Sequence, residues 1–118
     1  MFLSNPPVTP ETSQLYQSDI DDVGFVMNLS RLWAWRPEVY QSFAALRMLL
    51  MKSWSLSQRE MGVLVCATAS GLGDSYCSLA WGKKLAAVSD PATATAVLQG
   101  MASEKMTSRE TALADWAR

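Results

Sequence analysis

The fold is decided by residues 57–85, which read SQREMGVLVCATASGLGDSYCSLAWGKKL. The opening Ser57-Gln-Arg-Glu60 matches a capping box, in which a Ser hydroxyl and a Glu carboxylate satisfy backbone N–H groups at a helix N-terminus. Residues 61–69 are almost entirely apolar, which predicts a central helix covered on every side. Gly71-Leu72-Gly73 ends that helix, and Asp74 is expected to cap the next one. The stretch therefore predicts two consecutive helices at the centre of a helical fold.

A further helix is predicted upstream of this pair. Pro37 suits the first position of a helix, where its missing N–H is not needed. Large apolar residues then recur at i, i+4, i+7 and i+11, namely Val39, Phe43, Leu46 and Leu50. This spacing predicts a helix with a broad buried face.

Two more helices are predicted downstream. Asp90-Pro91 combines a capping residue with a proline at the first helical position. Thr107-Ser-Arg-Glu110 repeats the capping-box pattern before the last apolar segment. No segment shows the alternation of a strand beyond a few residues. The predicted fold class is all-α, a helical bundle of about six helices.

The N-terminal part is expected to differ from the rest. Residues 1–18 predict an extended arm because Pro6, Pro7 and Pro10 oppose helix formation. The first helix is expected from Asp19, since acidic residues suit a helix N-terminus, and it is expected to end before Arg36. Residues 19–118 then form a single helical domain. Its last helix is still apolar at Trp116, so we expect either that this helix packs against another subunit or that the domain continues beyond Arg118.

The composition excludes several classes of function. The chain has 118 residues, 49% of them hydrophobic, a net charge of −1, two cysteines and no histidine. Without imidazole there is no Ser-His-Asp triad, no Cys-His pair and no His-ligated zinc. Four Lys and six Arg are scattered along the chain, which argues against a nucleic-acid partner. We expect no metal and no cofactor.

The sequence also bears on location. No Lys or Arg precedes Arg31, so the basic region of a signal or transit peptide is missing. The longest weakly interrupted apolar stretch, residues 61–72, is too short to span a bilayer. Two cysteines are too few for a disulfide scaffold. We therefore expect a cytoplasmic protein with reduced thiols and no membrane partner.

Cys77 is the main candidate for chemistry. It falls in the first turn of the helix capped by Asp74, where the helix dipole favours a thiolate and lowers the thiol pKa. The carboxylate of Asp74 acts in the opposite direction, and the sequence leaves the net sign open. Cys66 lies in the middle of an apolar helix and is expected to be a small core residue.

These residues resemble a known family. Arg59-Glu60, the apolar helix and Gly-Leu-Gly-Asp74-Ser-Tyr-Cys77-Ser-Leu-Ala-Trp81 resemble the core of the alkyl hydroperoxidase D-like, or carboxymuconolactone decarboxylase, family. The resemblance covers roughly residues 55–100. That family has Arg-Glu at the start of a buried helix, then Cys-x-x-Cys and a His four residues after the second Cys. Here Asp74 stands in place of the first Cys, and Trp81 stands in place of the His.

The resemblance implies a fold, a function and partners. It implies an alkyl hydroperoxidase D-like bundle and a thiol-dependent hydroperoxide reductase, with Cys77 as the reacting thiol and Glu60 as the carboxylate that moves protons. We expect Asp74, next to Cys77, to take part in moving protons as well. It also implies an external thiol reductant and a homo-oligomer. The expected homo-oligomer is a trimer or a hexamer, with a dimer as the alternative.

Two alternatives stay open at this point. The first is a non-catalytic helical oligomer that binds a small apolar ligand in a pocket lined by Trp81 and Tyr76. The second is decarboxylation or another lactone reaction, which the absence of histidine makes less favoured.

Overall fold

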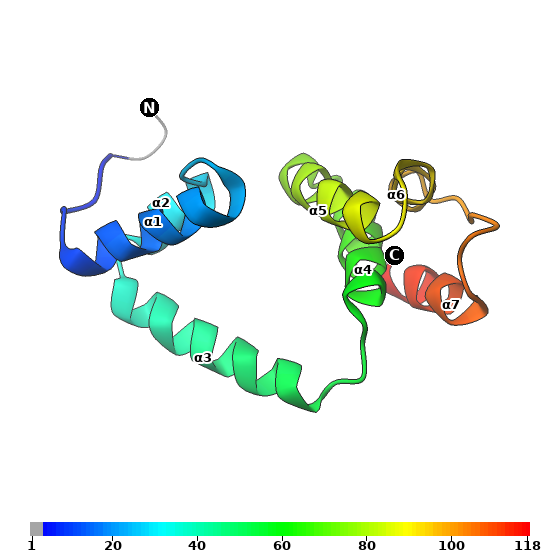
Figure 1. The fold of residues 1–118 in the computed structure, drawn as a ribbon, viewed down its shortest axis with the longest axis horizontal. Helices are drawn as coiled ribbons and strands as arrows, with labels where there is room; N and C mark the ends of the chain where they lie inside the picture. Colours follow the sequence, from blue (N-terminus) through cyan, green and yellow to red (C-terminus); the bar gives the residue numbers. More distant parts are fainter. Residues whose placement is uncertain (1–3) are drawn as a thin grey trace. The chain divides into compact units, whose positions relative to one another are not determined.

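The computed structural model describes residues 4–118, and its regular structure is helical throughout. The helices of this part are α1 (Pro10–Val23), α2 (Asn28–Trp33), α3 (Pro37–Ser53), α4 (Gln58–Gly71), α5 (Ser75–Val88), α6 (Pro91–Leu98) and α7 (Ser108–Ala117) (Figure 1). No strand occurs between residues 4 and 118, so the predicted all-α class is confirmed. The chain forms two compact units, Met1–Trp54 and Ser55–Arg118, which are described separately below.

The first helix begins at Pro10 rather than at Asp19, so the predicted extended conformation of residues 10–18 was wrong. Thr9 caps the helix: its hydroxyl accepts from the Thr12 N–H at 3.2 Å, and the Thr12 hydroxyl accepts from the Thr9 N–H at 2.9 Å. Pro10 occupies the first helical position, where a proline favours the helix because its φ is already suitable. Residues 1–3 of the predicted arm lie outside the described residues.

The single helix predicted from Asp19 to before Arg36 is two helices. Gly24 ends α1 with a φ of +85°, a conformation that favours glycine, and its N–H donates to Ile20 O. Asp19 is buried in the second half of α1, and its Oδ2 accepts from the Met27 N–H at 2.9 Å. Asp19 therefore fixes the connection between α1 and α2 instead of starting a helix.

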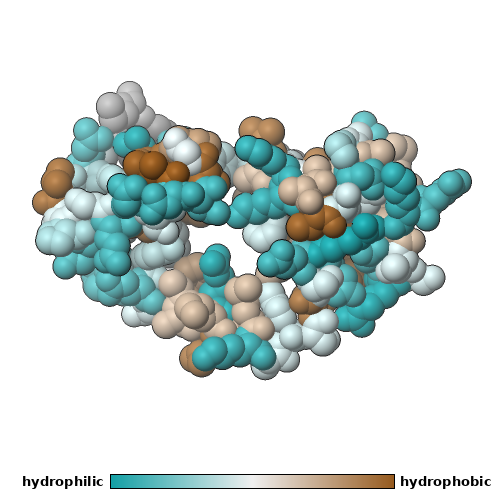
Figure 2. Space-filling model, in the orientation of Figure 1, coloured by the Kyte–Doolittle hydropathy of each residue, from teal (hydrophilic) through white to brown (hydrophobic). Residues whose placement is uncertain are grey.

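Helix α3 begins at Pro37 as predicted, but its apolar stripe is not buried. None of the described residues of α3 is buried, and hydrophobic side chains are visible at the surface along it (Figure 2). Within its own unit, α3 packs against α2, where the Trp33 ring stacks on Phe43 with ring centroids 5.4 Å apart. The predicted buried face was wrong for this unit because one short helix cannot cover a longer one.

The C-terminal unit is built around α4, which packs against α5, α6 and α7 (Figure 1). The buried core comes from all four helices and consists of Val63, Cys66, Ala67, Leu85, Ala94, Val97 and Ala114. The position of α4 as the central helix is as predicted. Its cover is incomplete in this unit, however, since Thr68 is exposed and Leu64 and Val65 are half-buried. This open face forms one wall of a pocket.

Candidate functional site

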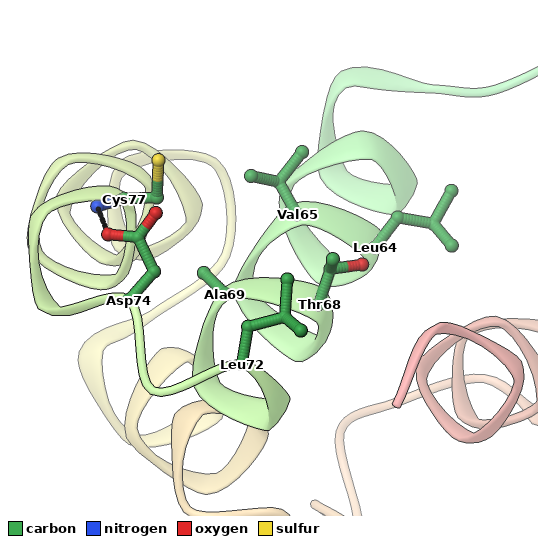
Figure 3. A pocket seen from close by; sticks show the side chains of 7 residues that line it. All are labelled: Leu64, Val65, Thr68, Ala69, Leu72, Asp74 and Cys77. Atoms are coloured by element: carbon green, nitrogen blue, oxygen red, sulfur yellow. Dashed lines mark hydrogen bonds between the residues drawn. The ribbon is translucent and has the colours of Figure 1, made fainter.

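A tight turn between α4 and α5 places Asp74 and Cys77 side by side. Gly73 has a φ of +68°, and the Asp74 N–H donates back to Ala69 O at 2.8 Å. Asp74 then caps α5, since its Oδ1 accepts from the Cys77 N–H at 3.0 Å (Figure 3). The predicted cap is confirmed, and Cys77 lies in the first turn of α5.

A pocket of about 210 Å³ lies beside this turn. It is lined by Leu64, Val65, Thr68, Ala69 and Leu72 of α4 with its C-cap, and by Asp74 and Cys77 at the start of α5 (Figure 3). The wall formed by α4 is apolar apart from Thr68, and the side formed by α5 carries a carboxylate and a thiol. Pockets that hold drug-sized ligands have volumes of about 300–1,000 Å³, so this pocket suits a smaller, mainly apolar molecule with one polar end.

The carboxylate decides the protonation of the thiol. A hydrogen bond with Asp74, partial burial and the negative charge of Asp74 all raise the pKa of Cys77 above its ordinary value. Hydrogen bonds from the backbone N–H and side chain of Cys77 lower the pKa of Asp74. The effect of the helix dipole is therefore outweighed. Near neutral pH the site holds a protonated thiol beside an ionised carboxylate.

Glu60 lies elsewhere on α4. Its Oε2 accepts from the Ser57 N–H at 2.8 Å, which completes the predicted capping box, and its Oε1 accepts from Arg109 Nε at 2.6 Å. The hydrogen bond from the Ser57 N–H and that from Arg109 lower the pKa of Glu60. Glu60 is in the first turn of α4 and is not among the residues that line the pocket beside Cys77.

The two aromatic residues expected in a pocket do not line this one. Trp81 packs at the edge of the core, with Lys84 Nζ 5.3 Å from its ring centroid. Tyr76 is 44% exposed, and neither ring is among the described residues around the pocket.

Cys66 is separate from the pocket. It is fully buried in the core, and burial raises its pKa to about 11. Cys66 and Cys77 are both free thiols. The prediction that Cys66 is a core residue is confirmed.

The pocket wall on α4 was not foreseen from the sequence. Its residues lie at i, i+1, i+4, i+5 and i+8 from Leu64, which places them on one helix face. That pattern could have identified the face. The helix is apolar all round, however, so the pattern alone did not distinguish this face from those that pack against α5, α6 and α7.

Comparisons of the chain with protein-family models, curated proteins and solved structures found no match. Within residues 4–118, no group of three or more Cys, Asp or Glu side chains is placed to hold a metal ion. No helix in this described part combines the length and apolar character needed to cross a membrane.

Proposed function

We propose that the chain is a peroxidase-related protein in which the Cys77 thiol reduces a small apolar hydroperoxide. One observation carries the proposal: Cys77 lies at an apolar pocket beside Asp74, whose carboxylate also lines the pocket and accepts from the Cys77 backbone N–H at 3.0 Å. The apolar wall of α4 suits the alkyl part of the substrate. The resemblance of residues 55–100 to the alkyl hydroperoxidase D-like family supports the same reaction.

The chemical step needs one proton acceptor and one proton donor. The Cys77 sulfur attacks the terminal oxygen of the hydroperoxide, the O–O bond breaks, and the sulfur is oxidised by two electrons to a sulfenic acid. Asp74 takes the thiol proton and delivers it to the leaving alkoxide, which departs as an alcohol. The raised pKa of Cys77 makes this transfer necessary near neutral pH, because little thiolate is present beforehand.

The sulfenic acid must be reduced by a thiol from outside the chain. Cys66 is fully buried in the core, does not line the pocket and is a free thiol, so the proposal takes the reducing thiol from outside the chain. An external thiol condenses with the sulfenic acid and releases water, and a second thiol then frees Cys77. A reducing compartment such as the cytoplasm would supply these thiols.

The test is to mix the protein with a short alkyl hydroperoxide and to trap sulfenic acid with a carbon nucleophile, followed by mass spectrometry. We expect modification at Cys77, faster than for free cysteine at the same pH. The Cys77→Ser variant is the control and should show no trapped product at this position. Oxidation no faster than that of free cysteine would contradict the proposal.

A second candidate is non-catalytic binding of a small apolar ligand in the same pocket. It is favoured by the raised pKa of Cys77, which keeps the sulfur a weak nucleophile. The variant Thr68→Phe, which fills the pocket, should weaken binding of a small apolar fluorophore. Thr95→Phe, at an exposed position of α6 away from the pocket, should not. Ligand binding together with an unreactive Cys77 would favour this candidate over the peroxidase.

A further inference from the structure

The pocket beside Cys77 carries a charge of one sign. Among the residues of 4–118 that line it, Asp74 is the single charged one, and all of them belong to Ser55–Arg118. Figure 3 shows the Asp74 carboxylate beside the Cys77 sulfur, with the apolar side chains of α4 across the pocket. A molecule that reaches the sulfur through this pocket therefore passes close to one negative charge.

The charge of Asp74 is present near neutral pH and acts on the sulfur. Hydrogen bonds from the backbone N–H and side chain of Cys77 lower the pKa of Asp74, so the carboxylate is ionised. A hydrogen bond with this carboxylate, partial burial and its negative charge raise the pKa of Cys77. An incoming reagent meets the same field at the atom where its new bond forms.

The helices packed against α5 place no opposite charge in the pocket. Arg59 and Glu60, the two charged residues of α4, form ion pairs with α7. Helix α6 has no charged residue within Pro91–Leu98. The lysines of α5 lie six and seven residues after Cys77, and neither of them lines the pocket. Within Ser55–Arg118, the charge of Asp74 therefore decides the sign of the field at the pocket wall.

We propose that the Cys77 site selects its thiol partner by charge, so that it admits cationic and neutral small thiols and disfavours anionic ones. The identity of this partner rests on the function proposed above, in which an external thiol reduces the Cys77 sulfenic acid. The S–O bond of the sulfenic acid breaks, the two sulfurs join, and the oxygen leaves as water with the proton of the external thiol. The Cys77 sulfur is reduced in this step and the external sulfur is oxidised.

The field of Asp74 acts on the whole attacking molecule. The attacking sulfur is a thiolate, so a second negative charge on the same molecule adds to its repulsion by Asp74, and an ammonium group offsets it. A charge about 6 Å from Asp74 in a water-like medium changes a rate about three-fold. A cationic and an anionic thiol of equal size should therefore differ by about 10-fold, most clearly at low ionic strength.

The first experiment measures charge selection on the reduced protein, without peroxide. Two methanethiosulfonate reagents, one with a trimethylammonium group and one with a sulfonate group, each form a mixed disulfide with Cys77 and release methanesulfinate. Mass spectrometry follows the reaction at Cys77, and each rate is divided by the rate of the same reagent with mercaptoethanol. We expect a cation-to-anion ratio of about 10, which falls as salt is added. The pKa of Cys77 cancels from this ratio, because both reagents meet the same thiol.

Two matched variants assign the ratio to one carboxylate. Asp74→Asn keeps a capping side chain at the start of α5 and should bring the ratio to about 1. Asp90→Asn makes the same change at the cap of α6 and should leave the ratio as it is. A ratio near that of mercaptoethanol in the unsubstituted chain, or a ratio that survives Asp74→Asn, would overturn the proposal.

The second experiment uses the sulfenic acid form and three thiols with the same two-carbon spacer, which are cysteamine, mercaptoethanol and mercaptopropionate. Each rate is divided by the fraction of that thiol present as thiolate. We expect cysteamine to be fastest and mercaptopropionate slowest, and Asp74→Asn to remove the order. Equal rates in the unsubstituted chain would overturn the charge selection. Failure of the peroxidase proposal appears separately, as the absence of sulfenic acid before any thiol is added, and the first experiment then decides the charge selection alone.

Discussion

Arg59 at the start of α4 binds Glu110, the carboxylate that caps α7, with 2.7 Å between Nε and Oε1. The reverse contact joins Arg109 of α7 to Glu60, the carboxylate that caps α4. Both capping boxes have the sequence Ser/Thr-x-Arg-Glu, and the arginine of each one binds the glutamate of the other. Two local helix-start signals are thereby converted into one tertiary connection within Ser55–Arg118.

The two halves of this connection should differ in strength. Glu110 is buried, and Arg59 also donates to Lys105 O at 2.6 Å, whereas Arg109 is mostly exposed. Arg59→Gln should lower the free energy of unfolding by about 1–3 kcal/mol, because it leaves a buried carboxylate without its cation. Arg109→Gln is the matched control and should cost clearly less, as exposed ion pairs do. Urea unfolding followed by circular dichroism measures both. Equal losses of unfolding free energy in the two variants would show that the burial of Glu110 does not strengthen its ion pair with Arg59.

The same carboxylates should make the C-terminal unit sensitive to acid. Burial raises the pKa of Glu110, but hydrogen bonds from Arg59 and from the Thr107 N–H together lower it by more. The pKa of Glu110 therefore lies below its ordinary value. The pKa of Glu60 is lowered as well. A carboxyl group with a lowered pKa in the folded state contributes stability above its unfolded pKa, and this contribution is lost as the pH falls through the folded value.

We therefore expect the melting temperature to fall progressively below a pH of about 4.5, near the unfolded pKa of glutamate. Thermal melts at a series of pH values measure this. Glu110→Gln, which cannot titrate, should start from a lower stability and show a shallower fall in acid. An unchanged slope in this variant would mean that other carboxylates carry the acid sensitivity.

Asp74→Asn should separate the two roles of this residue. Asparagine also caps helices well, so α5 should be retained, while loss of the negative charge lets the pKa of Cys77 fall towards its ordinary value. Alkylation of Cys77 by iodoacetamide near neutral pH should become faster. Oxidation by an alkyl hydroperoxide should become slower, because the carrier of the proton to the leaving alkoxide is gone.

Asp90→Asn provides the control for this variant, since Asp90 caps α6 in the same way but lies at a different helix start, away from Cys77. It should change neither rate. If Asp74→Asn made both reactions faster, Asp74 would be outside the proton path and only the thiolate fraction would matter.

The features that sequence reasoning predicted correctly depend on residues within one helical turn. The caps at Ser57, Asp74, Asp90 and Thr107 each bind a backbone N–H three residues later, so a local pattern was sufficient. The neighbouring positions of Asp74 and Cys77 follow from the same spacing. The start of α1 at Pro10, capped by Thr9, was missed because three nearby prolines were taken as helix breakers, although Pro10 lies at the permitted first position.

The features that were missed depend on distant parts of the chain. Arg59 and Glu110 are 51 residues apart, and nothing in either capping box indicates which carboxylate its arginine binds. Glu60 shows the same limit: its place in the capping box was predictable from the local sequence, but its contact with Arg109, 49 residues away, was not. The apolar stripe of α3 was read correctly as a helix face, but periodicity does not say what covers that face.

The closeness of α4 and α5 gives a last prediction, at Gly62. A Cβ at this position would lie 3.2 Å from Leu85 Cβ and 3.5 Å from Leu85 Cα, which belong to the rigid part of α5. Gly62→Ala should therefore push the two helices apart and lower the free energy of unfolding by about 1–3 kcal/mol, despite the better helix propensity of alanine.

Gly82→Ala is the matched control for Gly62→Ala. A Cβ at Gly82 would approach Leu98 Cδ1 to 2.9 Å, closer than any contact at Gly62, but this atom is the tip of a side chain that can rotate away. Its effect on urea unfolding should be small, because the gain in helix propensity offsets the adjustment of Leu98. If Gly62→Ala were neutral and Gly82→Ala costly, the packing of α5 would be limited by α6 rather than by the approach of Leu85 to α4.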